Sequence, residues 1–453
     1  MKKHFLIILF LIGFCTTQTF SLQSQTTNKN TPLYPRLEGT QEVLYTEVRS
    51  LLHSEVDSMR IIVLFRIQYD VLVFLQVNSY QGQYVATPSL DIECRDTNGI
   101  IKFRSEWRDS IFARSFDQTN ADDEYAYGIY EFSVAKNMYS VNISLSERNG
   151  QAIKKLRVPK VTIPEYGFSQ PIFTESNYRS TVIQPMIING NISFSKSQQY
   201  AIIPMYGNIE GEITASLKRL RANEEYAKHV KNVTATRVDI EPDVSLDIDP
   251  ADIGIALSNS KLQIIEMSDQ KIMRVHFPDN TIAPGRYSLV ISFKNGKNKK
   301  DSSVFEFSCI WETMPKTLIS AKYALEVMKY ILTEDQYDSM NSGSDIDMRK
   351  SIVDWWKKND PTPQTIYDEA MAEYFRRADK AFSAFQTINE SDGVMTERGK
   401  IALLYGFPKK IDKNMMSGNV QEEIWYYPDI LRKKYVFQQQ SAGRFLLKSI
   451  EDM

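Results

Sequence analysis

The sequence predicts a multidomain protein in which two all-β, sandwich-like (Ig-like) domains precede a C-terminal α+β domain. Two successive blocks, residues 41–160 and 161–311, contain short β-branched and aromatic runs separated by turn residues. From residue 312 the apolar spacing becomes helical, and strand-like runs return near the end of the chain. A length of 453 residues with 42% apolar residues is enough for roughly three packed domains.

The first residues have the pattern of a secretory signal peptide. Met1–His4 is basic, residues 5–14 are apolar and Cys15–Ser21 is small and polar, so we expect residues 1–21 to be removed and residues 22–40 to form a polar linker. The apolar run is too short to span a bilayer, which needs about 20 residues. A lipid on Cys15 is the alternative, and the bulky Phe14 before it disfavours this. We therefore expect a protein of the periplasm or outer membrane, or an extracellular one, with no transmembrane helix after signal removal.

The two β blocks are justified by their strand-like runs. In the first block these runs are Ile62–Ile67, Val71–Leu75, Leu90–Cys94 and Tyr139–Leu145. In the second they are Ile213–Leu217, Leu262–Ile265, Ile272–Phe277, Arg286–Phe293 and Val304–Ser308. Many turn-marked strands without helical periodicity between them are typical of a β-sandwich. Residues 217–232 fit either a helix or a long polar hairpin, and the pattern leaves both open.

Four helices and several strands are predicted in the C-terminal block, residues 312–453. A first helix spans Leu318–Leu332, a capping box at Thr333–Gln336 starts a second, and a third contains Met348–Trp356. Thr365 is the predicted N-cap of the fourth helix. Its predicted buried stripe consists of Tyr367, Met371, Tyr374, Phe375, Ala378, Phe382 and Phe385, and the predicted strands are Ile401–Tyr405, Glu423–Tyr427, Tyr435–Phe437 and Arg444–Lys448.

A series of motifs runs through this block: Trp355–Pro363, Asp368–Arg377, Gly393–Gly399, Leu404–Pro408 and Glu423–Tyr427. Their order and spacing resemble the GWxTD domain, a family of secreted bacterial proteins whose biochemical role is unassigned. The resemblance implies an architecture and export, and it implies no activity. Three positions depart from the family pattern, because Val394 replaces a Trp, Glu397 an Asp and Asp368 a common Asn. If that Trp and Asp serve a site in relatives, this chain has lost it; if they are structural, Val and Glu can replace them.

Several function classes lack support in the sequence. A net charge of −2 gives no reason to expect nucleic acid as a partner. Cys94 and Cys309 fall in different blocks, so we expect two separate buried thiols rather than a disulfide. His53, His229 and His276 are scattered without the spacing of zinc ligands, and no nucleophile motif is present.

One acidic run is a candidate metal site. Asp239, Glu241, Asp243, Asp247 and Asp249 supply the oxygen ligands that Ca²⁺ prefers, although the run lacks the turn glycine of a dedicated calcium loop. A solvated strand edge, protected by charge against pairing with another sheet, is the favoured interpretation. We therefore expect no cofactor, with Ca²⁺ as the alternative.

Glu369, Glu373 and Arg376 form the most enzyme-like group, because their spacing places them on one helix face. Two carboxylates near an arginine could perform acid–base chemistry, as in glycoside cleavage, with Asp360 and Glu397 as further neighbours. The favoured alternative is an ion-pair ladder that stabilises the helix, because perturbed carboxylates are also common in structural networks.

Eight residues of the motifs are candidates for an interaction surface: Trp355, Trp356, Gly393, Thr396, Arg398, Trp425, Tyr426 and Tyr427. Since side chains alternate along a strand, either Trp425 with Tyr427 or Tyr426 alone must face away from the core. The sequence thus favours an exported, non-catalytic envelope protein that acts as a protein-interaction or scaffold element, with another envelope protein as its partner. The alternatives are an extracytoplasmic hydrolase that uses the carboxylate pair, and carbohydrate binding by the β domains.

Overall fold

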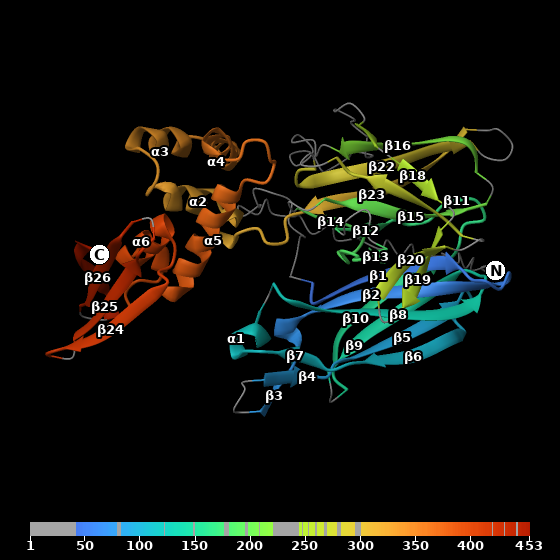
Figure 1. Ribbon diagram of the computed structural model, residues 1–453, viewed down its shortest axis with the longest axis horizontal. Helices are drawn as coiled ribbons and strands as arrows, with labels where there is room; N and C mark the ends of the chain where they lie inside the picture. The colour runs from blue at the N-terminus through green and yellow to red at the C-terminus, as the bar shows by residue number, and fades with distance from the viewer. Residues whose placement is uncertain are drawn as a thin grey trace, which may run out of the picture.

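The computed structural model describes residues 42–78, 83–121, 123–147, 150–175, 181–194, 198–207, 209–220, 244–246, 248–251, 253–258, 261–266, 270–278, 282–294, 300–418, 420–429, 431–440 and 443–453. The predicted signal peptide, the linker and most of the stretch 217–232 lie outside these ranges. Strands dominate, and the longer helices are found in the C-terminal part. Figure 1 shows residues 44–161 at the lower right, residues 167–310 at the upper right and residues 321–452 at the left.

The N-terminal part contains three antiparallel sheets, with the orders β1-β2-β8, β10-β9-β5-β6 and β3-β4-β7. A 3-10 turn, η1 (Tyr69–Val71), and a short helix, α1 (Phe116–Thr119), accompany them. The strands are β1 (Leu44–Leu52), β2 (Ser58–Gln68), β3 (Leu75–Asn78), β4 (Gln83–Ala86), β5 (Ser89–Asp96), β6 (Ile101–Arg108), β7 (Ile111–Ala113), β8 (Tyr125–Ala135), β9 (Tyr139–Ser146) and β10 (Ala152–Val161).

Strand β2 is buried on both faces. Ile61, Val63 and Phe65 belong to the core of the N-terminal sheets. Ile62 and Leu64, which point the other way, belong to a second core that continues into the next part of the chain. A strand covered on both faces has a nearly continuous apolar sequence, as this one does. The β1-β2-β8 sheet is therefore a middle layer between two others.

The second part of the chain also contains three sheets. Their orders are β11-β15-β21-β18 with β12 beside β15, β13-β20-β19, and β14-β23-β22-β16-β17, in which β14 runs parallel to β23. The strands are β11 (Gly167–Phe168), β12 (Ile172–Thr174), β13 (Val182–Ile183), β14 (Ile192–Ser193), β15 (Tyr200–Tyr206), β16 (Glu210–Leu220), β17 (Val244–Leu246), β18 (Ile248–Ala251), β19 (Ile253–Ser258), β20 (Lys261–Glu266), β21 (Lys271–His276), β22 (Gly285–Lys294) and β23 (Lys300–Ile310).

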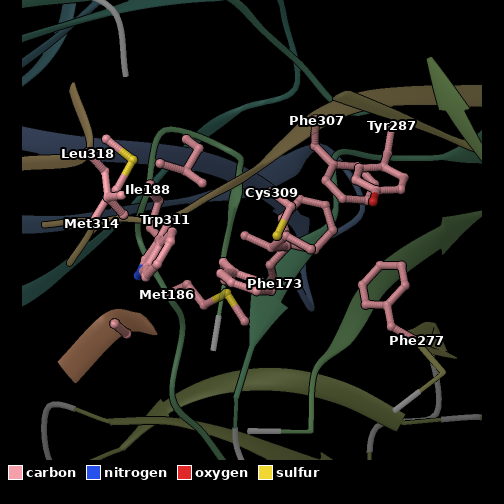
Figure 2. Packing of buried hydrophobic residues seen from close by; sticks show 14 of the residues in the cluster. Phe173, Met186, Ile188, Phe277, Tyr287, Phe307, Cys309, Trp311, Met314 and Leu318 are labelled. Atoms are coloured by element: carbon pink, nitrogen blue, oxygen red, sulfur yellow. The ribbon is translucent and has the colours of Figure 1, made fainter. Parts of the chain in front are cut away.

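The larger core is aromatic and crosses both predicted domain boundaries. Phe307 of β23 lies among the rings of Phe173, Phe277 and Tyr287, whose centroids are 4.9, 5.8 and 5.7 Å away (Figure 2). The same cluster contains Trp311, which is 1% exposed, and extends to the C-terminal helices. The boundaries at 160/161 and 311/312 stay predictions, and the parts that they separate share one apolar interior.

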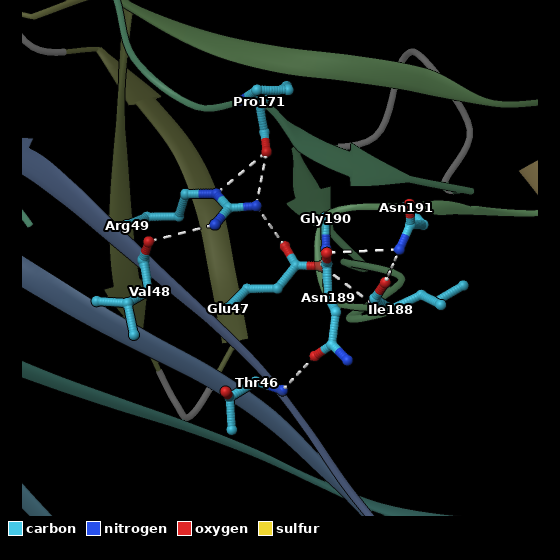
Figure 3. Close-up of polar contacts among 9 residues, drawn as sticks. All are labelled: Thr46, Glu47, Val48, Arg49, Pro171, Ile188, Asn189, Gly190 and Asn191. Atoms are coloured by element: carbon cyan, nitrogen blue, oxygen red, sulfur yellow. Dashed lines mark hydrogen bonds and ion pairs between the residues drawn. The ribbon is translucent and has the colours of Figure 1, made fainter. Parts of the chain in front are cut away.

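Buried polar contacts also join the two β parts. Glu47 and Arg49 of β1 are 4% and 8% exposed and pair at 2.6 Å. Arg49 donates to the carbonyl oxygen of Pro171 at 3.1 and 2.9 Å, and Glu47 accepts from the backbone N–H groups of Ile188 and Gly190 at 3.1 and 2.9 Å (Figure 3). Because each charged group has several partners, the pair can be buried without an orphaned charge.

Arg66 of β2 ties the N-terminal sheets to the start of the C-terminal part. Its side chain is 4% exposed, its guanidinium lies 4.1 and 4.3 Å from the ring centres of Tyr45 and Tyr125, and it pairs with Glu312. Glu312 is the first residue after the second β block in the sequence. The segment between that block and the helices is therefore attached to the N-terminal sheets through this ion pair.

The C-terminal part is an α+β unit whose last helix packs beside an antiparallel sheet of order β24-β25-β26-β27, with the other helices beyond it. Its elements are η2 (Lys316–Ile319), α2 (Ala321–Met328), α3 (Glu334–Asn341), α4 (Asp345–Asn359), α5 (Glu369–Ala384), η3 (Gly393–Met395), α6 (Glu397–Tyr405), β24 (Lys410–Met416), β25 (Val420–Tyr427), β26 (Lys433–Gln439) and β27 (Phe445–Asp452). Among the described helices, none has the length and apolar character needed to cross a bilayer.

Local signals located these helices well, with three exceptions. The capping box of Thr333 with Gln336 is confirmed. Thr365 is the wrong cap for α5, because the side chain of Asp368 accepts the N–H of Met371. Two residues of the predicted buried stripe do not lie in it, since Phe382 is 41% exposed and Tyr367, which is half-buried, precedes α5.

The third exception is Ile401–Tyr405, which was predicted as a strand and lies in α6. A run of five apolar residues fits both structures, and the N-cap at Thr396 decides for the helix. In the N-terminal part the predicted strand Val71–Leu75 is also wrong, since a 3-10 turn occupies residues 69–71 and β3 begins only at Leu75.

Cys94 and Cys309 are free and buried, as predicted. Burial raises the pKa of the Cys94 thiol to about 11 and that of Cys309 to about 12. Since the thiolate is the reactive form, both thiols are expected to resist a disulfide reagent such as DTNB in the native protein at mildly alkaline pH. Absorbance should report both thiols once guanidinium chloride unfolds the chain, and rapid native labelling of either one would contradict this burial.

Candidate functional site

The tryptophans of the first motif hold α4 against α5. Trp356 is 6% exposed and packs on Tyr374 and Phe375, whose ring centroids lie 5.3 and 5.9 Å away. Trp355 meets Trp356 edge to face at 5.0 Å. The indole of Trp356 is thus part of the helical core rather than of an open groove.

Thr362 connects the turn after α4 to the first turn of α5. The carboxylate of Glu369 accepts the hydroxyl of Thr362 at 2.6 Å, and Asp360 accepts the backbone N–H of Thr362 at 2.8 Å. Glu397, the other expected neighbour, instead accepts the backbone N–H of Leu447. Glu369 and Asp360 therefore bind the same turn, whereas Glu397 binds the backbone of β27.

Glu373 lies between two arginines on the exposed side of α5. Its carboxylate is 3.2 Å from Arg376 and 2.8 Å from Arg377, and its side chain is 49% exposed. Arg376 also donates to the hydroxyl of Tyr367 at 3.1 Å. The predicted ion pair between Glu373 and Arg376 exists. The second ion pair, between Glu373 and Arg377, was not predicted, although its i,i+4 spacing indicated it.

Asp368 caps α5 at a position where the GWxTD family commonly has Asn. Burial raises the pKa of the Asp368 carboxyl, and the acids Asp360 and Glu369 raise it further. The ionised form is thus disfavoured in the folded state, so this group contributes stability at low pH that is lost as the pH rises.

Replacing Asp368 with Asn is expected to stabilise the protein at neutral pH by about 0.5–1 kcal/mol, because Asn keeps the capping acceptor without the charge. Denaturant unfolding followed at several pH values would measure this. The advantage of the variant should shrink as the pH falls through the raised pKa of the wild-type carboxyl, and an advantage that grows in acid would contradict the assignment.

Two glycines, one in η3 and one in the first turn of α6, are required where these elements meet. A Cβ on Gly393 would lie 2.2 Å from the carbonyl oxygen of Ala381, and one on Gly399 would lie 2.0 Å from that of Gly393. Thr396 closes the turn, since its hydroxyl accepts the N–H of Gly399 at 3.0 Å and donates to the carbonyl of Gly393 at 2.8 Å. Val394, which replaces the family's Trp, is fully buried.

Arg398 and Glu423 form a buried ion pair between α6 and the sheet. The pair is 3.3 Å long, with 11% and 6% of the side chains exposed. The guanidinium lies 4.0 Å from the ring centre of Phe445, while Glu423 also accepts from the indole of Trp425 at 3.3 Å and pairs with Lys413 at 3.4 Å. Burial lowers the pKa of Arg398, and Glu423 opposes that change.

The three consecutive aromatics of β25 alternate as expected. Trp425 is 0% and Tyr427 9% exposed on the helix side, whereas Tyr426 is half-buried on the opposite face. There it lies 4.8 Å from Lys410 (nitrogen to ring centre), and its hydrogen bond with Asp412 raises its pKa. Tyr426 is therefore the aromatic of this group that the outer face presents.

The acidic candidates for Ca²⁺ are largely outside the described residues. This applies to Asp239, Glu241, Asp243 and Asp247; the backbone of Asp249 belongs to β18, and its side-chain position is not described. Within the described ranges, no group of three or more His, Cys, Asp or Glu residues could hold a metal ion.

Two cavities lie in or beside the β sheets. One, of about 440 Å³, is lined mainly by apolar residues: Leu72, Val73, Leu75, Val85, Ala86, Thr87, Pro88, Glu147 and Ile153. The other, of about 490 Å³, is located where Arg66 meets Glu312, and its wall includes Tyr127, Val182, Pro185 and Lys261. Neither of these two cavities includes Glu369, Glu373 or Arg376.

Sequence reasoning missed two acids that hold the C-terminal part together. Glu423 alternates with Trp425 along β25, and this period of two could have indicated a buried carboxylate. Asp379 of α5 accepts from the backbone N–H and hydroxyl of Thr317 at 2.8 and 2.6 Å, which fixes η2 to the helix. No local pattern marks Asp379, because its partner is 62 residues away.

The family comparison agrees with this architecture. The model of the GWxTD domain matches residues 292–445. This part of the chain therefore matches a GWxTD domain, in a region that runs from the end of β22 through β23, the helices and β24–β26 to the first residue of β27.

The other two comparisons add no functional relative. A search of curated proteins found no match. Among solved structures, the chain is similar to the purple acid phosphatase PPD1 from yellow lupin (Lupinus luteus) seeds, with 6% identity over 59% of this chain and a TM-score of 0.19. The match spans 41% of the phosphatase chain, and likeness at this level carries no argument about function.

Proposed function

We propose that this protein is an exported component of the bacterial cell envelope that acts without catalysis, as a protein-interaction or scaffold element. Export rests on the signal-like pattern of residues 1–21, and the interaction role is assigned to the GWxTD domain and the β sheets ahead of it. The proposal includes no cofactor. It also keeps the finer interpretation that residues 41–160 and 161–311 are Ig-like sandwiches.

The observation that supports this proposal best is how the polar residues of the motifs are used. Glu373 is paired with two arginines, and Arg398 is paired with Glu423 in a buried position. Thr396 closes the turn before α6. A general acid or base must reach the substrate proton with a suitable pKa, and these groups instead hold helices and strands together. The motifs are better explained as the framework of a domain than as a reaction centre.

The test is crosslinking in intact cells followed by pull-down of the full-length protein from envelope fractions. We expect a specific envelope protein to be captured at a level that does not depend on Glu373. A protein recovered only from the cytoplasm would overturn the proposal. So would glycan or peptide hydrolysis by the purified chain, and so would selective glycan retention on an array in place of a protein partner.

Glu373→Gln is the variant that separates a scaffold from a hydrolase. Because the pair is half exposed, the substitution is expected to cost less than about 1 kcal/mol of stability and to leave partner capture unchanged. Lys380→Gln, which changes another exposed charge of α5 outside the candidate group, is the matched control. A catalytic Glu373 would show itself as turnover present in the wild type and lost in the glutamine variant while the unfolding midpoint stays constant.

A further inference from the structure

The two edges of the C-terminal sheet differ in a way that indicates where a partner strand binds. In the described part of the chain, β24 pairs only with β25, and β27 pairs only with β26. An edge strand offers a row of backbone N–H and C=O groups to any extended segment that reaches it. The question is which of the two edges is open to such a segment.

The β27 edge is partly blocked. The side chain of Glu397 accepts the backbone N–H of Leu447, so α6 covers part of this edge. The pairing of β27 with β26 is also interrupted by a register shift between Val436 and Phe437. Side-chain capping and bulges are devices that protect edges against further pairing.

Among the residues that the structure describes, the β24 edge has neither device. Its seven residues pair with β25 without a register shift, from Lys410 opposite Tyr426 to Met416 opposite Val420. In Figure 1 this strand forms the lower border of the C-terminal sheet. Ile411 and Met415 are 42% and 67% exposed, and both point to the helix side because their neighbours in register are Trp425 and Gln421. A regular edge with exposed apolar residues is a suitable template for strand addition.

The charges on β24 select the kind of strand that fits. Lys410 and Lys413 of β24 have side chains that are 66% and 61% exposed; Lys410 pairs with Asp412 of the same strand at 3.0 Å on the outer face, so Lys413 is the basic residue of the helix-side row. Lys413 lies between Ile411 and Met415 on the same face, and its own partner, Glu423, is only 6% exposed. The edge thus presents an apolar–basic–apolar row, which is complementary to an apolar–acidic–apolar row on an incoming strand.

A second copy of β24 fits less well. If two copies paired antiparallel so that Ile411 met Met415 of the other copy, a two-fold axis would place Lys413 opposite itself. Like charges directly opposite each other destabilise a strand pair. The charge pattern therefore favours a different, acidic segment over self-association.

We propose that the β24 edge binds an extended acidic segment of a partner protein by strand addition. Apolar side chains of the segment lie opposite Ile411 and Met415, and a carboxylate lies opposite Lys413. This inference rests on the proposed interaction role and names the surface and the partner chemistry for it. The added strand extends the four-stranded sheet and leaves the helical layer unchanged.

The experiment uses the full-length protein and labelled peptides with the central sequence Val-Thr-Glu-Thr-Val, a symmetric pattern that fits in either strand direction. A matched peptide carries Lys in place of Glu, and another carries Thr in place of both Val residues. Fluorescence anisotropy should show the Glu peptide binding about tenfold more tightly than the Lys peptide. Hydrogen exchange should show slower exchange of β24 amides when the Glu peptide is bound.

Two variants and one control assign the effect to this edge. Met415→Asp should weaken binding of the Glu peptide about fivefold or more, and Lys413→Glu should reverse the preference toward the Lys peptide. Ile450→Asp is the matched control, because Ile450 is a 50% exposed apolar residue on the opposite edge strand. Thermal unfolding of each variant shows whether it is folded. If Lys413→Glu does not fold, Met415→Asp still tests whether the peptide binds at β24.

Equal binding of the Glu and Lys peptides, no binding of either, or exchange protection confined to β27 would overturn the inference. A dimer in sedimentation that Met415→Asp dissociates would also overturn it, since a second copy would then occupy the edge. An envelope partner whose capture is unaffected by Met415→Asp would refute the role of β24 while leaving the proposed function standing.

Discussion

Replacing Gly399 with alanine is expected to destabilise the C-terminal domain by about 3 kcal/mol, as overpacking does where the neighbours cannot move. In an ordinary helix the same change stabilises the protein by roughly 1 kcal/mol, so the sign of the change in unfolding free energy distinguishes the two cases. The added Cβ would lie 2.0 Å from the carbonyl oxygen of Gly393 and 2.6 Å from that of Val394. Both contacts are backbone atoms of the turn that Thr396 holds, and a rotamer change relieves neither.

Denaturant unfolding followed by tryptophan fluorescence measures this effect, since three of the five tryptophans, Trp355, Trp356 and Trp425, report on the C-terminal part. Lys400→Ala, one residue along on the exposed side of α6, is the control and should shift stability by less than about 0.5 kcal/mol. A Gly399→Ala protein as stable as the wild type would show that α6 can move away from the turn.

Replacing Arg398 with methionine is expected to cost about 3 kcal/mol, because it leaves the buried carboxylate of Glu423 without its buried partner. Lys413 remains within reach of Glu423, but its side chain is 61% exposed and provides weaker, solvent-screened compensation. Methionine keeps much of the volume beside Phe445 and Phe385, so the loss measures the charge rather than a cavity.

A double-mutant cycle gives the sharper result. Glu423→Gln alone should also destabilise, whereas Arg398→Met combined with Glu423→Gln should cost clearly less than the sum of the two single changes. The matched exposed pair, Lys409 with Asp429, should show a coupling below about 1 kcal/mol in the same measurement. Additive costs for Arg398 and Glu423 would mean that the two side chains do not depend on each other.

The elements that the sequence predicted are those whose cause is local. The capping box at Thr333 and the alternation from Trp425 to Tyr427 depend on residues a few positions apart, and the structure confirms both. The strand–helix error at Ile401–Tyr405 came from a short apolar run that fits either structure. The strand β24 was missed because its sequence has three exposed apolar residues and no buried face.

The sequence predicted which side chains belong to the candidate site, but it did not predict most of their ion-pair and hydrogen-bond partners. Spacing on one helix placed Glu373 with Arg376, and this contact exists. The partners of Arg398 and Glu397 are 25 and 50 residues away, and only the packing of α6 on the sheet brings them together. Long-range partners of this kind decide whether a carboxylate is available for chemistry, and spacing along a helix carries no information about them.

The double-sided burial of β2 joins the two β parts through a shared strand. Ile62 and Leu64 of this strand pack into the core of the second β part, and Arg66 pairs with Glu312 just before the helices. The described parts of the chain are therefore joined by packed side chains and a buried ion pair. Separating these parts would expose the apolar face of β2 to water, which opposes their separation.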